Sequence, residues 1–182
     1  MNKKKLLLRI PVPVLIAVAL TVIWNVKTHP TPDPLSKAYP GVLVKAENEE
    51  DFKLEAKAID LDTLKAYGLP IIIDFGSDSC IPCQKMAPVL ETMNAEMQGK
   101  AIIKFVDVWK YKDAAADFPI KVIPTQVLIN SDGTPYVPSD TIGIDFTMYS
   151  SKDTNEHIFT VHQGGLTENQ MRAILEDMGV TE

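Results

Sequence analysis

Two mostly apolar runs, one on each side of a segment with helical spacing, dominate the centre of the chain. Residues 69–75 form a short run rich in β-branched side chains, which predicts a buried strand. Residues 101–108 predict a second strand of the same kind. The segment between them, residues 80–98, has helical periodicity and ends before Gly99. The pattern therefore predicts a strand, a helix and a second strand in succession.

Weaker patterns predict the remaining elements. They are short helices at 60–67 and 113–118, a strand at 126–130, a turn at 130–133 leading into a partner strand at 134–137, a strand at 158–162 and a helix from Thr167 to Met178. Residues 42–44 could form a further strand, and residues 139–156 are polar without a clear period, which predicts an insertion or a long loop. This order predicts an α/β fold with a mixed central sheet and helices on both faces.

The first 26 residues carry four basic side chains and no acidic one. Apart from Thr21 the chain is apolar from Ile10 to Trp24, and the wider span 6–26 reaches the roughly 20 residues that cross a bilayer. This pattern predicts that residues 1–26 are a signal anchor with a transmembrane helix, whose basic end stays in the cytoplasm while the rest of the chain lies outside. Small residues at 17–19 leave open a cleaved signal peptide and a secreted domain.

Residues 27–40 contain four prolines, which predicts a stiff, extended linker. The remainder, residues 41–182, is long enough for one domain with its own core. Without the four basic residues of the predicted anchor, 14 basic and 24 acidic residues remain, for a net charge of −10. Such an acidic domain lacks the basic surface that nucleic acid requires, so we expect no nucleic-acid partner.

The only two cysteines, Cys80 and Cys83, lie where the strand at 69–75 gives way to the helix at 80–98. Cys80 would then lie at a helix N-terminus, where unpaired N–H groups and the helix dipole favour a negatively charged sulfur. Since a thiolate is the species that attacks disulfides, Cys80 is the candidate nucleophile. Cys83 lies one turn further on the same face, close enough to form a disulfide with Cys80. The spacing therefore predicts a redox-active pair.

Two other roles compete for the cysteine pair. A structural zinc site needs further ligands, and the three histidines His29, His157 and His162 have no paired spacing. A structural disulfide between residues three apart would constrain the unfolded chain little. Redox chemistry is the favoured interpretation, and we expect no metal site and no bound cofactor.

Several motifs taken together resemble the thioredoxin superfamily. They are Ile73-Asp74-Phe75, Cys80-Ile81-Pro82-Cys83, Met86-Ala87-Pro88, the segment 118–125 that ends in Ile123-Pro124-Thr125, and Gln163-Gly164-Gly165-Leu166. A CxxC pair alone is a weak signal. The acid six residues before the pair, the proline five residues after it and the Ile-Pro-Thr some forty residues later make the set specific. The resemblance covers about residues 60–180 and implies a thioredoxin-like three-layer fold.

The resemblance also assigns roles to the residues of the first two motifs. Cys80 is expected to attack a client disulfide, and Cys83 to resolve the mixed disulfide that results. Asp74 matches a buried family acid that exchanges a proton with the second cysteine, here Cys83. Because Asp74 is flanked by apolar residues, burial should raise its pKa. The alternative is an aspartate at a strand edge that accepts a hydrogen bond from a turn.

The later motifs imply a client-binding surface. Pro124 matches the family's cis-proline, which would turn the main chain of Ile123 toward the sulfurs and offer hydrogen bonds to a client peptide. Thr125 and Gly164 are expected to belong to the same surface. An ordinary trans proline that opens the next strand is the alternative for Pro124.

Two departures from the family pattern concern client choice. Ser79 and Gly76 stand where the family usually has aromatic side chains, and the insertion at 139–156 is additional. Between the cysteines, Ile81 and Pro82 replace the usual Gly-Pro and carry no charge that would stabilise a thiolate. This favours a reducing rather than an oxidising pair.

The sequence thus predicts a monomeric, membrane-tethered thiol–disulfide oxidoreductase on the extracytoplasmic side, which reduces disulfides in client proteins. An extracytoplasmic reductase needs electrons, so a membrane thiol donor such as a transmembrane thiol carrier is an expected partner. Two alternatives stay open. One is a thioredoxin-fold binding or chaperone module with structural or metal-bound cysteines, and the other is a disulfide oxidant or isomerase.

Overall fold

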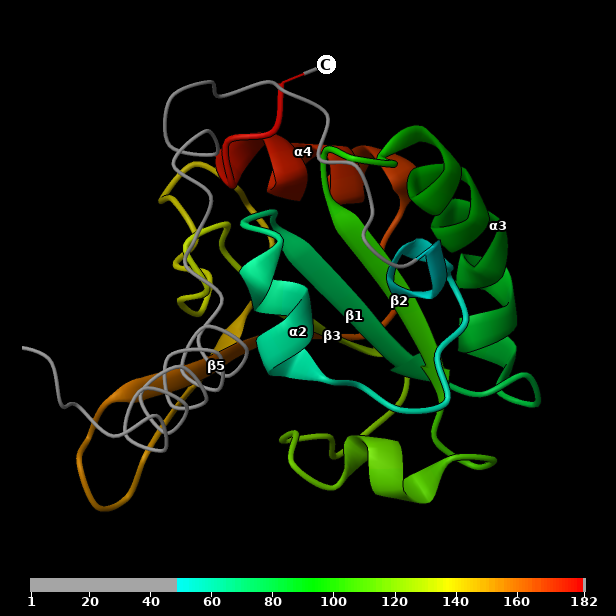
Figure 1. Ribbon diagram of the computed structural model, residues 1–182, viewed down its shortest axis with the longest axis horizontal. Coiled ribbons are helices and arrows are strands. Elements are labelled where there is room, and N and C mark those ends of the chain that lie inside the picture. Colours follow the sequence, from blue (N-terminus) through cyan, green and yellow to red (C-terminus); the bar gives the residue numbers. More distant parts are fainter. Residues whose placement is uncertain (1–48, 182) are drawn as a thin grey trace, which may run out of the picture. The chain divides into compact units, whose positions relative to one another are not determined.

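The computed structural model describes residues 49–181 of the chain (Figure 1). The predicted anchor at 1–26, the linker at 27–40 and the possible strand at 42–44 lie outside the described residues. Among the helices of residues 49–181, none has the length and apolar character that crossing a membrane requires.

A mixed sheet of five strands forms the centre of the fold, in the order β2-β1-β3-β5-β4. Its strands are β1 (Ile71–Gly76), β2 (Ile102–Asp107), β3 (Thr125–Ile129), β4 (Thr147–Ser150) and β5 (His157–Gln163). β1 and β2 are parallel, and all other neighbours are antiparallel. Both parallel strands end at the same edge of the sheet, from which the chain leads into the next helix (Figure 1).

Helices cover both faces of this sheet, as the sequence predicts. α3 (Ile81–Glu96) and α4 (Glu168–Asp177) pack on one face with Ile72 and Leu128. On the other face, α2 (Leu61–Ala66) and two short 3₁₀ helices, η1 (Glu49–Phe52) and η2 (Lys112–Ala115), pack around Ile71, Ile73 and Phe75. Successive side chains of β1 therefore enter opposite cores, and all are buried, which explains why the run is apolar except for Asp74.

Capping residues set the ends of two helices where the sequence predicts them. Asp60 is the N-cap of α2 and accepts a hydrogen bond from the backbone N–H of Thr63 at 3.1 Å. Thr167 caps α4 through a reciprocal pair of hydrogen bonds with Gln170, a capping box. The two long apolar runs and the helix between them also match their predicted positions to within about two residues, the usual uncertainty of an element's end.

Three predicted segments differ in the structure, namely residues 134–137, residues 113–118 and the insertion at 139–156. The turn at 130–133 forms, with Asn130 N–H bonded to the Thr134 carbonyl at 2.8 Å, but residues 134–137 make only one isolated bridge and no strand. Pro135 lacks an N–H for a ladder, and β3 pairs with β5 instead. The helix predicted at 113–118 is a single 3₁₀ turn at Lys112–Ala115.

The predicted insertion at 139–156 is not irregular throughout. It contains β4, which forms the sheet edge and pairs with β5. The side chains of β4 are mostly exposed, so the strand shows no alternation in hydrophobicity that the sequence could reveal. Ahead of it, Ile142, Ile144 and Phe146 pack against the core between the sheet, α3 and α4.

Candidate active site

Cys80 is the N-cap residue of α3, just beyond the end of β1. Its backbone N–H donates to the Ser77 carbonyl at 3.0 Å, and its own carbonyl accepts from Gln84 N–H at 2.9 Å. Pro82 lies in the first turn, where no N–H is needed. The Cys80 side chain is partly exposed and makes no capping hydrogen bond of its own. Its sulfur therefore lies at the positive end of a 16-residue helix, accessible from solvent.

Cys83 lies one turn deeper and is only 4% exposed. Burial raises the pKa of the Cys83 thiol well above its ordinary value, and the neighbouring Cys80 sulfur and the charge of Asp74 add to that effect. A hydrogen bond from the Ser77 backbone opposes it. Cys83 is thus held as a thiol, and it needs a proton acceptor before its sulfur can attack.

Asp74 is fully buried at the centre of the sheet, on the face covered by α3. Its Oδ1 accepts a hydrogen bond from Gln126 Nε2 at 2.6 Å, whereas its Oδ2 is buried without a hydrogen-bond partner in the described part of the chain. Desolvation raises the pKa of Asp74 to about 7, even though the Gln126 bond works in the opposite direction. The carboxyl group can therefore hold or release a proton near neutral pH.

Gly76 separates Asp74 from Cys83. A Cβ at this position would lie 3.2 Å from Asp74 Oδ2, 3.3 Å from Cys83 Sγ and 2.9 Å from the ring of Phe105. The unpartnered carboxylate oxygen and the buried sulfur thus border one small space beside Gly76, which the Phe105 ring also borders and which is too small for a methyl group. The sequence showed Gly76 only as a departure from the family's aromatic residue.

The two motifs that the sequence predicts to bind clients lie beside the cysteines. The Ile123–Pro124 peptide bond is cis, as predicted, and the Ile123 carbonyl lies 3.9 Å from Cys80 Sγ. Gly164 N–H donates to the Pro124 carbonyl at 2.9 Å, which fixes the glycine loop against the cis-proline. Thr125 is buried, and its hydroxyl donates to the Val122 carbonyl at 2.7 Å. All predicted site residues therefore lie around one point at the start of α3.

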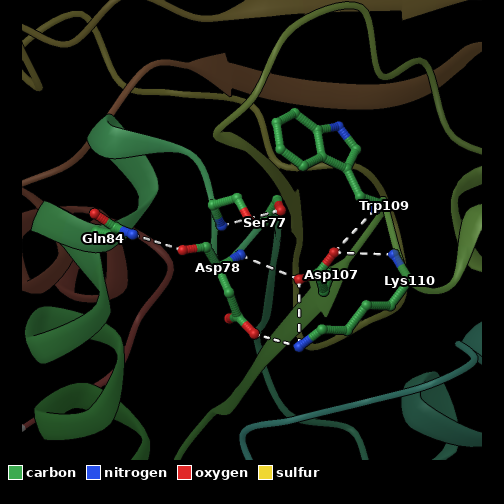
Figure 2. Close-up of polar contacts among 7 residues, drawn as sticks. Ser77, Asp78, Gln84, Asp107, Trp109 and Lys110 are labelled. Carbon is green, nitrogen blue, oxygen red and sulfur yellow. Dashed lines mark hydrogen bonds and ion pairs between the residues drawn. The ribbon is translucent and has the colours of Figure 1, made fainter.

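A second buried carboxylate, Asp107 at the end of β2, was missed by the sequence analysis. Figure 2 shows it between the loop before Cys80 and the loop after β2. Its Oδ1 accepts from the backbone N–H groups of Trp109 at 2.9 Å and Lys110 at 3.0 Å, and its Oδ2 accepts from Asp78 N–H at 3.1 Å. The Lys110 ammonium pairs with the carboxylates of both Asp78 and Asp107 (Figure 2). Asp107 thus connects the cysteine loop to the neighbouring loop.

Gln126 was also missed as a site residue, although it is a polar side chain at the start of an apolar run. It is fully buried and contacts Asp74, Met86 and the Gly164 carbonyl through its amide nitrogen. The signal that could have found it is positional: both Asp74 and Gln126 interrupt apolar strands that pair directly.

Exposed apolar side chains adjoin the cysteines and the cis-proline segment. Ile81 is 68% exposed and Val122 is 52% exposed. The surface next to Cys80 is thus apolar in spite of Ser79 and Gly76. In residues 49–181, no group of three or more His, Cys, Asp or Glu side chains is placed to hold a metal ion.

Comparison with known proteins identifies the family. The thioredoxin family model matches residues 46–144. Thioredoxin C-2 of Corynebacterium nephridii is 36% identical over 86 residues, covering 47% of this chain and 73% of that protein. Thioredoxin 1 of Chlorobaculum tepidum is 37% identical over 73 residues, covering 40% of this chain and 71% of that protein. The solved structure of chloroplastic thioredoxin z aligns with a TM-score of 0.49 at 19% identity, over 70% of this chain and 95% of that one.

The family match contains β1, the cysteine pair, β2 and the cis-proline segment, so it includes the residues described above apart from the glycine loop. The chain belongs to the thioredoxin family, and it is a thiol–disulfide oxidoreductase.

Proposed function

We propose that this protein reduces disulfide bonds of client proteins on the extracytoplasmic side of a membrane to which it is tethered. Cys80 is the nucleophile, Cys83 the resolving thiol and Asp74 the proton acceptor for Cys83. The observation that carries this assignment is the buried Asp74 Oδ2, which has no partner among the described residues and borders the same space as Cys83 Sγ. A carboxylate there is placed to take the proton that Cys83 must lose.

The reaction proceeds in two exchanges. The Cys80 thiolate attacks one sulfur of the client disulfide, so a Cys80–client bond forms and the other client sulfur leaves as a thiolate. Cys83 then gives its proton to Asp74 and attacks the Cys80 sulfur, which breaks the Cys80–client bond. The second client sulfur leaves as a thiolate and is protonated from solvent. Two electrons pass to the client, and the protein is left with a Cys80–Cys83 disulfide.

Client binding uses the main chain around the cis-proline. Ile123, Pro124 and Thr125 border Cys80 on one side, and Gly164 is hydrogen-bonded to the Pro124 carbonyl. We infer that an extended client segment bonds to main-chain groups of these residues, with its disulfide over Cys80. The exposed Ile81 and Val122 supply apolar contacts next to it.

The reductive direction is supported by the absence of charge between the cysteines. Neither Ile81 nor Pro82 offers a cation or a donor side chain to a Cys80 thiolate. Burial also disfavours a thiolate at Cys83. A dithiol whose thiolates are weakly stabilised gives up its electrons more readily, and this makes the pair reducing.

The membrane tether and the location are supported by the N-terminal sequence. The basic residues at positions 3–9 followed by an apolar span favour an anchor with its basic end in the cytoplasm. On the far side of that membrane, the Cys80–Cys83 disulfide has to be reduced again. We propose a membrane protein with a transmembrane thiol relay as the electron donor.

The chemistry can be tested with the full-length protein in detergent and insulin as the disulfide substrate. We expect Cys80→Ser to abolish insulin reduction and Cys83→Ser to accumulate a mixed disulfide through Cys80. The redox equilibrium with glutathione measures the direction. A Cys80–Cys83 disulfide that is reduced more readily than glutathione disulfide would contradict a reductive role, and full activity in Cys80→Ser would contradict the enzyme assignment.

Location requires a separate experiment in intact cells. A maleimide that cannot cross membranes should label Cys80 after mild reduction, and the protein should remain with the membranes after an alkaline wash. Labelling only after cell lysis would place the domain in the cytoplasm. Recovery in the soluble fraction with residues 1–19 missing would indicate a cleaved signal peptide.

A further inference from the structure

Three hydrogen-bond acceptors of the described structure surround the amide nitrogen of Gln126. It lies 2.6 Å from Asp74 Oδ1, 3.1 Å from the Gly164 carbonyl oxygen and 3.4 Å from Met86 Sδ. The two N–H groups of the amide can bond to Asp74 and to Gly164 together. The surroundings of this side chain therefore favour a hydrogen-bond donor.

The Gly164 carbonyl fixes which way the amide faces. If the amide were turned over, the Gln126 Oε1 atom would face the Gly164 carbonyl oxygen, and two acceptors cannot bond. The donor side is therefore held toward Asp74 whether or not the carboxyl group is protonated. One buried side chain thus connects the acid under Cys83 to the glycine loop at the client surface.

Gln126 is a poor choice for a residue that only fills the core. Its Oε1 atom is buried without a hydrogen-bond partner in residues 49–181, which costs stability. An apolar side chain would avoid that cost, and the rest of β3, Val127 to Ile129, is apolar. The donor that Gln126 offers to Asp74 is the compensating feature.

Other ionisable groups near Asp74 are few. On α3 the facing groups are Cys83 and, beyond it, Cys80. On β2 the residue paired with Asp74 is Phe105, which carries no charge. On β5, His162 pairs with Gln126 rather than with Asp74, and its Nδ1 bonds to the Asp145 carbonyl. Gln126 is thus the one hydrogen-bond donor that the described structure gives the Asp74 carboxylate.

We propose that Gln126 is a positioning residue for the resolving step: it holds the Asp74 carboxylate through Oδ1, leaves Oδ2 free to face Cys83, and stabilises the ionised acid. This inference rests on the proposed role of Asp74. Without the donor, the buried carboxylate keeps its proton to a higher pH, and Cys83 loses its proton acceptor at neutral pH.

The resolving step can be isolated with DTNB, an aromatic disulfide that releases one coloured thiolate in each exchange. In the reduced full-length protein the first release depends on DTNB concentration, whereas the second, the attack of Cys83 on the mixed disulfide, does not. We expect Gln126→Leu to move the pH midpoint of the second phase up by about one to two pH units. Below both midpoints the second phase then slows by roughly ten- to a hundredfold. The first phase keeps its rate.

Two further variants separate this inference from the proposed function. Asp74→Asn should abolish the pH midpoint of the second phase. The double variant Asp74→Asn with Gln126→Leu should show a second phase no slower than that of Asp74→Asn alone. If Asp74→Asn leaves the midpoint in place, the proton role of Asp74 is wrong. If Asp74→Asn removes it while Gln126→Leu leaves it unmoved, only the role of Gln126 is wrong.

A control distinguishes positioning from loss of packing. Leu128 lies two residues further along β3 on the same face and is also fully buried. Leu128→Ala should lower the unfolding midpoint in urea without moving the pH midpoint of the second phase. If it moves that midpoint as far as Gln126→Leu does, the effect is structural. Should Gln126→Leu fail to fold, Gln126→Met offers a flexible side chain without an N–H donor and is expected to give the same shift.

Discussion

Two buried aspartates at neighbouring positions of the sheet have opposite electrostatic properties. Asp74 in β1 has one hydrogen-bond donor, and desolvation raises its pKa to about 7. Asp107 at the end of β2 is also desolvated, but three backbone N–H groups and the Lys110 ammonium keep its pKa below the ordinary value. Burial alone therefore does not decide whether a carboxylate holds a proton; the number of donors around it does. The acid with an unpartnered oxygen suits proton transfer, and the acid with hydrogen-bond donors on both oxygens holds two loops together.

Among the variants that test this comparison, loss of the Asp107 side chain is expected to lower the stability most. Asp107→Ala leaves the N–H groups of Asp78, Trp109 and Lys110 without their acceptor. We expect it to lower the free energy of unfolding by about 3 kcal/mol, measured by urea denaturation. Asp117→Ala, at an exposed position of the following loop, is the control and should change stability by less than about 0.5 kcal/mol. Equal effects of the two variants would show that the Asp107 bonds contribute nothing specific.

Replacing Asp74 is expected to change the free energy of unfolding in the opposite direction. Its pKa rises from 3.8 to about 7, so between these pH values the folded state keeps a proton that the unfolded state has lost. The contribution of Asp74 to the stability of the native protein therefore falls as the pH rises from 4 to 7 and is then constant. Asp74→Asn removes this penalty and should be more stable than the native protein by about 2 kcal/mol above pH 7.

The difference in unfolding free energy between Asp74→Asn and the native protein depends on pH, and this dependence serves as the control. The raised pKa makes the stability difference between the two proteins change by about 4 kcal/mol between pH 4 and pH 7, so below pH 4, where both side chains are neutral, Asp74→Asn should have lost its gain and be the less stable protein. Contributions from Asp107 and other acids cancel in the difference between the two proteins. Urea unfolding of both proteins from pH 4 to pH 9 measures it. A gain that is the same at all pH values would mean that Asp74 is not protonated in the folded protein at neutral pH.

A smaller effect is expected when the space between Asp74 and Cys83 is filled. In Gly76→Ala the new methyl group would lie 2.9 Å from the Phe105 ring, so that ring has to move. We expect a loss of about 1 kcal/mol in unfolding free energy and a slower second phase with DTNB. Gly165→Ala is the matched stability control, because its Cβ would meet only the Pro82 carbonyl at 4.0 Å. An unchanged second phase in Gly76→Ala would argue against direct proton transfer through this space.

The smallest effect concerns the ion pairs of Lys110. Its ammonium pairs with Asp78 and lies 3.7 Å from Asp107 Oδ2, but the Lys110 side chain is 57% exposed. Lys110→Ala should therefore cost no more than about 0.5 kcal/mol, and less at high salt. A loss as large as that of Asp107→Ala would mean that the ion pair, rather than the backbone N–H groups, stabilises the Asp107 charge.

The sequence predicted best those elements whose burial produces a recognisable pattern of hydrophobic residues. Residues 69–75 and 101–108 have side chains buried on both faces of the sheet, so their mostly apolar runs marked them as buried strands. The strand β4 could not be predicted, because its side chains are mostly exposed and its sequence therefore shows no alternation of hydrophobic and polar residues. The partner strand predicted after the 130–133 turn was wrong, because pairing with β5 is a choice between distant segments that a local turn signal does not contain.

Within the site, the sequence alone predicted the residues to which we assign the roles of nucleophile, resolving thiol and proton acceptor, since each is a chemical type at a fixed spacing: Cys80, Cys83 and Asp74. It could not determine that the two buried acids differ. Asp74 and Asp107 both lie in apolar runs, and burial alone would raise the pKa of both. Only the tertiary structure brings three backbone N–H groups to Asp107 and lowers its pKa, whereas Asp74, with the Gln126 amide as its one donor among the described residues, keeps the raised pKa that burial causes. Hydrogen-bond donors reach a buried oxygen from segments far apart in the chain, so the tertiary structure decides what the local pattern cannot.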